Sequence, residues 1–339
     1  ININLFSELL TTWKFVYTLE SLYNRYDIKI VLSGFESPIA RVASSVASDN
    51  NKMMSCDCVW SIGENPMEFA STQHKFSDRF FLWGKWHHDL MCASFDKSSG
   101  HIIAGYVGDN YIPLMKNEGK NFREHQLNKY NKIITVFDSG ASEDGHFPKD
   151  IYIDYVKAIK LIAEEFNALV VLKIKKDDER YENIIKFNDD GSLITHHKKG
   201  SLETALNSDV VIGIASSGPA SISAVHGIQA IFYDPNKMVW DKWELCKPSC
   251  PIIRSLPDLQ KILRELLSSN ITKIAPSPEY IDPYGDGKSQ QRIENYIQNV
   301  FDNLYLGKNT AMLRADDIYK KQWGNDKVIT KEKFKQGIK

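Results

Sequence analysis

Two serines and a glycine interrupt an apolar run at residues 210–221, VVIGIASSGPAS. The proline after them favours the first turn of a helix, so Ser216, Ser217 and Gly218 are expected at a helix N-terminus. Backbone N–H groups and the helix dipole stabilise an anion there, and the serine hydroxyls add donors. The pattern indicates a phosphate site, and N-capping of the helix by one serine is the alternative explanation.

Two lysines end a second apolar run, VLKIKK at residues 171–176. Alternate residues of a strand point to the same face, so Lys173 and Lys175 share one face. A phosphate in the same cleft would pair with one of these cations, whereas solvation at the strand exit would need no ligand. We assign both lysines, and Ser139 from another loop, to donor binding.

Carboxylates follow two other apolar runs. Asp138 ends the run in VFDSGASEDGHF, residues 136–147. Glu64 follows a predicted strand of the first half, in SIGENP at residues 61–66. A carboxylate at such a strand end can act as base, nucleophile or cation stabiliser, although Asp before Ser-Gly also forms turns. Two carboxylates on opposite walls of a cleft suit glycosyl chemistry.

Further polar residues are candidates for holding an acceptor or the transferred sugar. VLSGFESP places Ser33 and Glu36 after a predicted strand, and Arg41 follows on the next helix. Arg41 can bind an anionic acceptor or a sugar carboxylate, and His146 lies behind Asp138. The histidine pair at 87 and 88 is more typical of packing or surface than of a metal site. No metal ion or cofactor is expected, because a helix N-terminus and cations can stabilise a leaving phosphate.

Composition narrows the class of protein. The chain has 339 residues, a formal charge of −1, 42% hydrophobic and 25% charged residues, which is ordinary for a globular protein. The balanced charge disfavours nucleic acid as the main partner. The sequence has no apolar stretch of the roughly 20 residues that span a bilayer, and no signal peptide is visible. Five scattered cysteines lack zinc-site spacing and favour a reduced, cytoplasmic protein.

Strand patterns alternate with helical patterns along the chain, which predicts βαβ units and parallel sheets. The expected strands lie at 28–33, 58–63, 80–84, 101–108, 132–140, 168–175, 209–215 and 229–234. The expected helices lie near 5–24, at 151–166, after Ser201 as a cap, from Pro219, at 256–269 and from Lys288. The polar stretch at 115–131 is interpreted as a link between domains.

The fold class that follows is α/β, with two Rossmann-like domains whose parallel sheets face a cleft, plus C-terminal helices. The predicted boundaries give an acceptor-side domain at 1–125, a nucleotide-sugar domain at 126–287 and a helical tail at 288–339. The helix from Lys288 is expected to pack back toward the first domain. Ligands of such sheets bind at the carboxyl ends of the strands, where the candidate loops lie.

Two segments of the second half resemble a known enzyme family. ALNSDVVIGIASSGPASISAVHGIQAIFYDP (205–235) and DPYGDGKSQQRIENYI (282–297) resemble the donor-nucleotide domain of bacterial surface-polysaccharide glycosyltransferases of the two-Rossmann, or GT-B, type. The second string is similar to the D-G-K-x-x-x-R-I tail of capsule enzymes and, more loosely, of poly(glycerol phosphate) polymerases. The His-Pro pair of many such enzymes is missing after KIKK, which weakens the link to the polymerases.

Within this group the chain most resembles the retaining β-Kdo transferases, which use CMP-β-Kdo. GENP and VFDSG match the family's glutamate and aspartate positions with Glu64 and Asp138. The resemblance implies that Asp138 attacks the anomeric carbon in a double displacement and that Glu64 acts as base toward the acceptor. It implies O-antigen or capsule assembly in the cytoplasm, with a glycan acceptor and at most peripheral membrane association through other assembly proteins.

Three other functions stay open at this stage. A CDP-glycerol-type phosphotransferase shares the tail motif, and a sugar-nucleotide 2-epimerase shares the two-domain architecture. A non-catalytic nucleotide-sugar binding module is the third. Neither the acceptor sugar nor the linkage follows from the residues.

Overall fold

The computed structural model describes residues 5–34, 38–59, 77–93, 99–137, 149–173, 193–195, 200–214, 217–237, 249–268 and 278–330. The chain divides into two compact units. The first unit comprises Ile1–Asn110 and Asp282–Lys339, and the second comprises Tyr111–Ile281. The first unit is therefore built from two segments of the chain, and the second from a single one. No helix within the described ranges is long and apolar enough to cross a bilayer.

The first unit contains, among the described residues, a sheet of five strands in the order β1-β2-β3-β4-β11. The first four strands are mutually parallel, and the last pairs antiparallel with β4. The strands are β1 Ile30–Ser33, β2 Met54–Cys58, β3 Arg79–Leu82, β4 Gly100–Ile103 and β11 Val328–Thr330. The strand expected at 58–63 therefore occurs earlier in the chain, and β11 had no counterpart in the sequence prediction.

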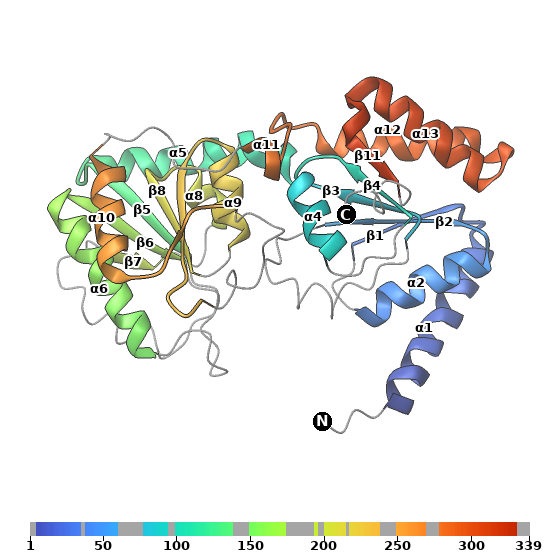
Figure 1. The fold of residues 1–339 in the computed structure, drawn as a ribbon, viewed down its shortest axis with the longest axis horizontal. Coiled ribbons are helices and arrows are strands. Elements are labelled where there is room, and N and C mark those ends of the chain that lie inside the picture. Colours follow the sequence, from blue (N-terminus) through green and yellow to red (C-terminus); the bar gives the residue numbers. More distant parts are fainter. Residues whose placement is uncertain are drawn as a thin grey trace. The chain divides into compact units, whose positions relative to one another are not determined.

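Helices from both chain segments pack on this sheet. They are α1 Leu5–Arg25, α2 Pro38–Asn50, α4 Lys85–Ala93, α12 Ser289–Asn303 and α13 Lys308–Trp323. Helices α12 and α13 lie side by side (Figure 1), and Tyr296, Val300 and Ala315 share one core with Phe81 and Ile102 of the sheet. The prediction that the helix from Lys288 packs on the first domain is thus confirmed.

A buried ion pair ties the two segments of the first unit together. Arg79 Nη2 lies 2.6 Å from Asp316 Oδ2, and both side chains are almost fully buried. The Tyr296 hydroxyl donates to Asp316 at 2.7 Å and accepts from Arg79 Nε at 3.1 Å. The charge of Arg79 on β3 is therefore compensated by Asp316 on α13, which lies 237 residues further along the chain.

The second unit contains a parallel sheet in the order β10-β9-β8-β5-β6-β7. Its strands are β5 Lys132–Phe137, β6 Ala168–Lys173, β7 Leu193–Thr195, β8 Val210–Ile214, β9 Gln229–Tyr233 and β10 Ile252–Ile253. Four of them match predicted strands, whereas β7 and β10 are short and were not predicted. The fully buried strands β6 and β8 explain why the sequence shows unbroken apolar runs there.

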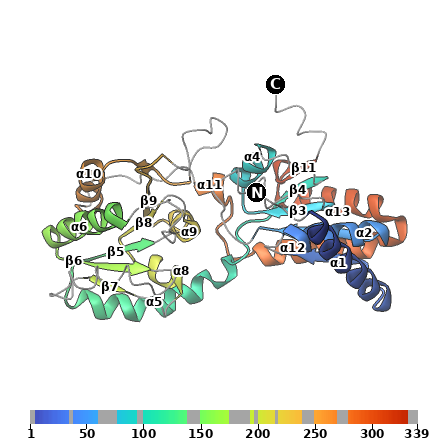
Figure 2. The ribbon, with the colours of Figure 1, turned by 90° about the horizontal axis from the view of Figure 1, so that it is seen from below.

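Helices cover both faces of this second sheet (Figure 2). The side chains of Ile134, Leu172 and Ile212 pack with α6 Lys149–Glu165 and α10 Leu256–Leu267. Alternate residues point to the other face, where three further described helices pack. These are α5 Ile112–Leu127, α8 Ser201–Ala205 and α9 Gly218–Val225, and α11 Pro278–Ile281 ends the unit.

Two local predictions need correction. Part of the stretch interpreted as a link, 115–131, forms helix α5. The helix was not predicted because it packs on its neighbour through a close approach at Gly119 and has no apolar stripe. A Cβ at Gly119 would lie 2.3 Å from the Glu203 carbonyl oxygen of α8, so only glycine fits there. Helix α8 is capped by Gly200, not by Ser201, and shows no side-chain cap bond.

Candidate functional site

The strand order of the second unit contains a topological switch point between β5 and β8. The chain proceeds outward from β5 to β6 and β7, and returns to place β8 on the other side of β5. Connections leaving the two strands diverge there, and ligands of open α/β sheets bind outside the carboxyl ends of the strands at such a point. The segments that follow these two strands are the ones with Asp138 and with Ser216–Gly218. Sequence motif and topology therefore coincide at this edge.

Ser217 is the N-cap residue of α9, but its hydroxyl does not cap the helix. Its backbone is extended, with φ −147° and ψ 113°, and no side-chain capping bond forms. The close packing of Ser217 on the sheet depends on Gly213, since a Cβ there would lie 2.7 Å from the Ser217 Cβ. The alternative explanation, that this serine serves only as a cap, is therefore wrong for Ser217. Gly218 opens the helix one residue before Pro219.

Lys173 ends β6 in the same row of the sheet. Its Cα pairs with that of Phe137 on β5, and Phe137 pairs in turn with Gly213 on β8. Residues aligned in this way point to one face, which here is the face covered by α8 and α9. With strands about 4.8 Å apart, Lys173 and Gly213 are separated by about 10 Å of backbone across the end of β5.

The Lys173 side chain is buried, with 6% of the residue exposed. Burial lowers the pKa of its ammonium group, and the carboxylate of Glu203 on α8 opposes part of that shift. A desolvated cation at a strand end gains from an anionic ligand, because the ligand charge offsets the cost of burial. The arrangement is suited to holding one phosphate between a cation and a helix N-terminus.

The first unit offers a polar pair at the carboxyl edge of its own sheet. Ser33 ends β1, and its hydroxyl donates to the Asp57 carboxylate on the adjacent strand β2, both residues being buried. Ser33 was predicted as a site residue from the sequence, whereas Asp57 was not. Asp234, a buried carboxylate directly after β9 of the second unit, was not predicted either. The available signal was the same in both cases, a lone aspartate in or after an apolar run.

Several predicted site residues lie outside the described part of the chain. They are Glu36, Glu64, Asp138, Ser139, His146, Lys175 and Ser216. Arg41 lies in α2, and its side chain is also outside the description. The roles assigned to these residues stay predictions. Within the described part, the structure brings Lys173, Ser217 and Gly218 to one edge of one sheet.

The described histidines of the first unit, His87, His88 and His101, take part in its packing. His87 is fully buried, with its ring edge-on to Trp83 and Trp86. His88 Nδ1 lies 2.8 Å from His101 Nδ1, so one ring donates to the other. Groups of three or more His, Cys, Asp or Glu side chains that could hold a metal ion do not occur among the described residues.

The D-G-K-x-x-x-R motif holds the returning chain segment on the first unit. Arg292 is fully buried between two rings, 3.4 Å from the centroid of Tyr284 and 4.5 Å from that of Trp323. It also pairs with Asp286 and donates to the Ala104 carbonyl oxygen. These contacts give the motif a structural role in this chain.

A second set of contacts strengthens the same junction. The Asp109 carboxylate accepts from Gly287 N–H, and Asp282 accepts from Tyr106 N–H at 2.8 Å. Burial raises the pKa of Asp109 to about 6, the Gly287 N–H bond opposes this, and the nearby charges of Asp282 and Asp286 add to it. The junction therefore contains a carboxyl group that is easier to protonate than usual.

Comparison with known proteins identifies the fold but no family. No family model matches the chain, and no curated protein matches it. Among solved structures, Staphylococcus aureus MnaA with UDP is 17% identical, with a TM-score of 0.60, covering 89% of this chain and 82% of that one. A putative UDP-N-acetylglucosamine 2-epimerase from Listeria monocytogenes is 14% identical, with a TM-score of 0.61, covering 86% and 79%.

A third similar structure is the UDP-GlcNAc 2-epimerase from Neisseria meningitidis bound to UDP-GlcNAc. It is 13% identical, with a TM-score of 0.55 over 85% of this chain and 81% of that one. At these identities the likeness is one of fold. The chain has the two-Rossmann, GT-B architecture, and the α/β fold class predicted from the sequence is confirmed.

Proposed function

We propose that this chain is a nucleotide-sugar enzyme of surface-polysaccharide assembly, with the donor phosphate bound at the switch point of the second unit. The observation that carries the proposal is the non-capping hydroxyl of Ser217, which packs against Gly213 in the same sheet row as buried Lys173. The hydroxyl, the α9 N-terminus and the ammonium group together supply donors and positive charge for a phosphate. Similar folds whose names include UDP or UDP-GlcNAc ligands agree with a nucleotide-sugar substrate.

In its finer form, the proposal is glycosyl transfer from CMP-β-Kdo with retention. Asp138 directly follows β5, the central strand at the switch point, and would attack the anomeric carbon as CMP leaves. The acceptor hydroxyl would then attack the same carbon, breaking the glycosyl–aspartate bond while Glu64 takes the hydroxyl proton. Stabilisation of the leaving phosphate is assigned to the helix N-terminus and Lys173, and turnover is expected without an added metal ion.

A second candidate is epimerisation of a UDP-sugar at C2. It is favoured by the fold likeness to 2-epimerases over 85–89% of this chain. The two candidates differ in nucleotide base and in product. Incubation with CMP-Kdo or UDP-GlcNAc, followed by chromatography, distinguishes CMP release from a change of sugar configuration.

Two N-cap serines give a matched test of the phosphate site. Ser255 caps α10 by accepting from Asp258 N–H at 3.2 Å, whereas Ser217 makes no cap bond. Ser217→Ala should weaken CMP binding roughly 10- to 100-fold, the value of a bond to a charged group. It should leave the free energy of unfolding within about 0.5 kcal/mol. Ser255→Ala should instead lower the free energy of unfolding by about 1 kcal/mol and leave the affinity for CMP unchanged.

Calorimetric titration with CMP, CDP and UDP, with urea unfolding of each variant, measures both quantities. Equal nucleotide affinity in wild type and Ser217→Ala would overturn the phosphate site. Preference for UDP over CMP would favour the epimerase candidate. For the finer proposal, Asp138→Asn should abolish transfer while CMP still binds, and intact-protein mass spectrometry with donor alone should find one added sugar on the peptide containing Asp138.

A further inference from the structure

One side of helix α1 presents large apolar side chains to solvent. Leu10, Trp13 and Tyr17 are 46%, 66% and 73% exposed. At about 100° per residue, these three positions fall within about 60° of the helix circumference, so they form one stripe. Leucine and tryptophan are ordinarily well buried, and a contiguous exposed group of such side chains marks an interaction surface.

The packing of α1 on its own unit does not use this stripe. The helix packs through Val16 and Tyr23, whose positions lie about 100–120° around the helix from Tyr17. The Tyr23 hydroxyl also bonds to Ser44 of α2 at 3.2 Å. Figure 1 shows α2 beside α1, with the first turns of α1 projecting beyond it. The described residues of the first unit therefore leave the stripe open to an external surface.

Two cations border the stripe on the side away from the packed residues. The positions of Lys14 and Arg25 lie about 60° and 80° around the helix from the aromatic end of the stripe, and both side chains are exposed. Neither forms an ion pair with any described residue, and the Arg25 guanidinium lies over the Tyr26 ring at 5.5 Å. The acid two positions further on, Asp27, pairs with Lys29 instead. Both positive charges are therefore available to an anionic surface.

The acids of α1 lie on other sides of the helix. Glu20 accepts from the Asn50 amide of α2 at 2.5 Å, so its carboxylate is directed toward α2. Position 8, the other acid of the helix, is nine residues from Tyr17, which is half a turn out of phase. The order around the helix is thus packed residues, apolar stripe and cations. An interfacial helix has this order, because its apolar side enters the acyl boundary while Lys and Arg stay at headgroup level.

The types of side chain favour a bilayer over a protein partner. Tryptophan and tyrosine combine an apolar ring with one polar group, and both are enriched where a membrane meets water. The anchors of tight protein interfaces fill pockets, whereas a single projecting helix offers a convex surface. A fluid lipid surface adapts to a convex helix without a preformed pocket.

We propose that the stripe of Leu10, Trp13 and Tyr17, with Lys14 and Arg25 at its border, docks the first unit directly on an anionic lipid bilayer. The resemblance seen in the sequence implied at most association through other assembly proteins, whereas this surface needs none. The proposal does not rest on the proposed function, because all five residues belong to the first unit and the donor site to the second.

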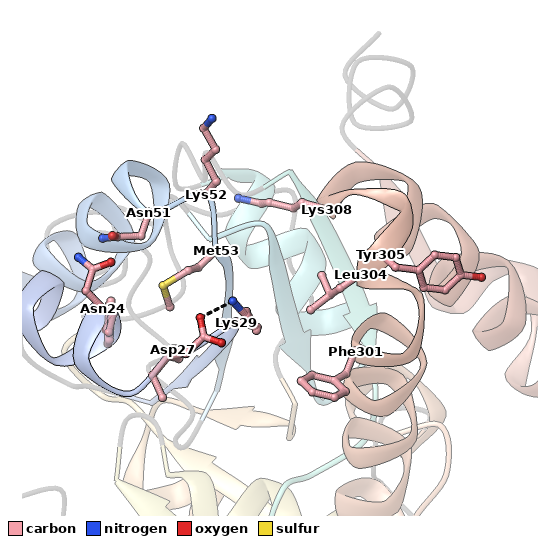
Figure 3. A pocket seen from close by; sticks show the side chains of 12 residues that line it. Asn24, Asp27, Lys29, Asn51, Lys52, Met53, Phe301, Leu304, Tyr305 and Lys308 are labelled. Carbon is pink, nitrogen blue, oxygen red and sulfur yellow. Dashed lines mark hydrogen bonds and ion pairs between the residues drawn. The ribbon is translucent and has the colours of Figure 1, made fainter.

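A hollow of about 630 Å³ at the amino edge of the same sheet shows the opposite charge pattern. Figure 3 shows the pair that Asp27 and Lys29 form in its lining. Lys308, at its border, lies 2.8 Å from Asp78 and 3.7 Å from Asp49. These charges are compensated within the unit, unlike the two cations beside the α1 stripe, so the hollow gives no comparable reason to bind an anionic surface.

Co-sedimentation of the full chain with lipid vesicles tests the proposal. Wild type should bind vesicles of equal parts phosphatidylcholine and phosphatidylglycerol, and should bind pure phosphatidylcholine roughly tenfold more weakly. Trp13→Ser and Tyr17→Ser should each lower the partition coefficient roughly tenfold, because each removes a large ring from the acyl boundary. Lys14→Gln should lower it about fivefold, and on the mixed vesicles only.

The chain offers matched controls for these variants. Leu10→Ser should weaken vesicle binding, whereas Leu22→Ser should not, although Leu22 is on the same helix and is similarly exposed, at 43%. The position of Leu22 lies about 140° around the helix from Tyr17, outside the stripe. Lys261→Gln, at an exposed position of α10 in the second unit, should bind as wild type does. Urea unfolding should be the same for all variants, since every substituted side chain is exposed.

Several results would overturn the proposal. They are an absence of wild-type binding to the mixed vesicles, and equal weakening by Leu10→Ser and Leu22→Ser. Self-association without lipid that Trp13→Ser abolishes, together with no vesicle binding, would assign the stripe to a second copy of the chain instead. Ser217→Ala should bind vesicles as wild type does. Loss of CMP binding in that variant, with no vesicle binding by wild type, would leave the proposed function intact and reject only this inference.

Discussion

The two sheets of this chain have similar architecture but differ in how the polypeptide forms them. The second sheet, formed by one continuous segment, reverses its strand order between β5 and β8. The described parallel strands of the first sheet follow each other in sequence order, from β1 to β4, and the returning segment completes the unit with β11, α12 and α13. The strand order of the second unit thus contains a switch point, the place where sheets of this kind bind ligands, whereas the first unit depends on a contact between distant segments.

This difference predicts where each unit is vulnerable. The first unit relies on a buried charge pair that spans 237 residues, Arg79 and Asp316. The second relies on a close packing of glycine against a helix start, at Gly213 and Ser217. Hydrogen exchange followed by mass spectrometry in increasing urea reports the two units separately, because each yields its own peptides.

The largest expected effect comes from Asp316→Ala. It leaves the Arg79 guanidinium buried without its carboxylate, which should cost about 3–5 kcal/mol in the first unit and little in the second. The urea concentrations at which peptides from β3 and α13 reach half exchange should decrease by the same amount. Asp317→Ala is the control, since its pair with Lys320 is largely solvent-exposed and should cost less than about 0.5 kcal/mol. Equal destabilisation of both units would contradict the comparison.

A smaller effect is expected from Gly213→Ala in the second unit. The added Cβ would lie 2.7 Å from Ser217 Cβ and 3.0 Å from Phe232 Cδ1, so overpacking should cost about 1–3 kcal/mol. CMP affinity should fall as well, since Ser217 must shift. Ile212→Val, in the same strand but facing α6 and α10, should cost about 0.5–1.5 kcal/mol with no loss of affinity. A Gly213→Ala protein that binds CMP as wild type does would refute the coupling.

The smallest effect concerns pH and Asp109→Asn. The folded pKa of Asp109 is raised to about 6, above the unfolded value of 3.8. Its contribution to stability is therefore fully present below pH 3.8 and is lost as pH rises toward and through 6. Asn keeps a neutral bond to Gly287 N–H, so the variant should gain about 1 kcal/mol at pH 8 and match wild type at pH 4. Urea unfolding across pH 4–8 measures this, and parallel curves for both proteins would disprove it.

Much of the fold followed from local pattern. The β-branched runs at β5, β6 and β8 are fully or nearly fully buried, which is why apolar runs located them. The strand β2 was misplaced because Ser55 and Asp57 are polar within it. Ser55 N–H donates to Asp78 at 2.9 Å, and Asp57 accepts from Ser33, so pairing across elements satisfies groups that look unfavourable in sequence.

Other elements escaped prediction because their partners are remote in sequence. Helix α5 packs through Gly119 and through an ion pair of Arg123 with Asp209 at 3.0 Å. Strand β11 pairs with β4, more than 200 residues away, and its three residues carry little local signal. For the candidate site, sequence located Lys173, Ser217 and Gly218 correctly at one sheet edge. It could not show that the serine hydroxyl is not used as a cap, because that depends on backbone angles.

The split construction of the first unit sets an order of events during synthesis. At roughly 5–20 residues per second, the ribosome needs roughly 10–50 s to make the 237 residues between Arg79 and Asp316. Before that interval ends, the second unit, whose chain ends at Ile281, can already complete its own sheet. Strands β1–β4 are synthesised early, and one apolar face of their sheet stays uncovered until helices α12 and α13 have been made. The unit whose first segment is synthesised first is thus the last to complete its fold. A nascent chain stalled before α13 would expose the apolar face of this sheet, which a chaperone can bind.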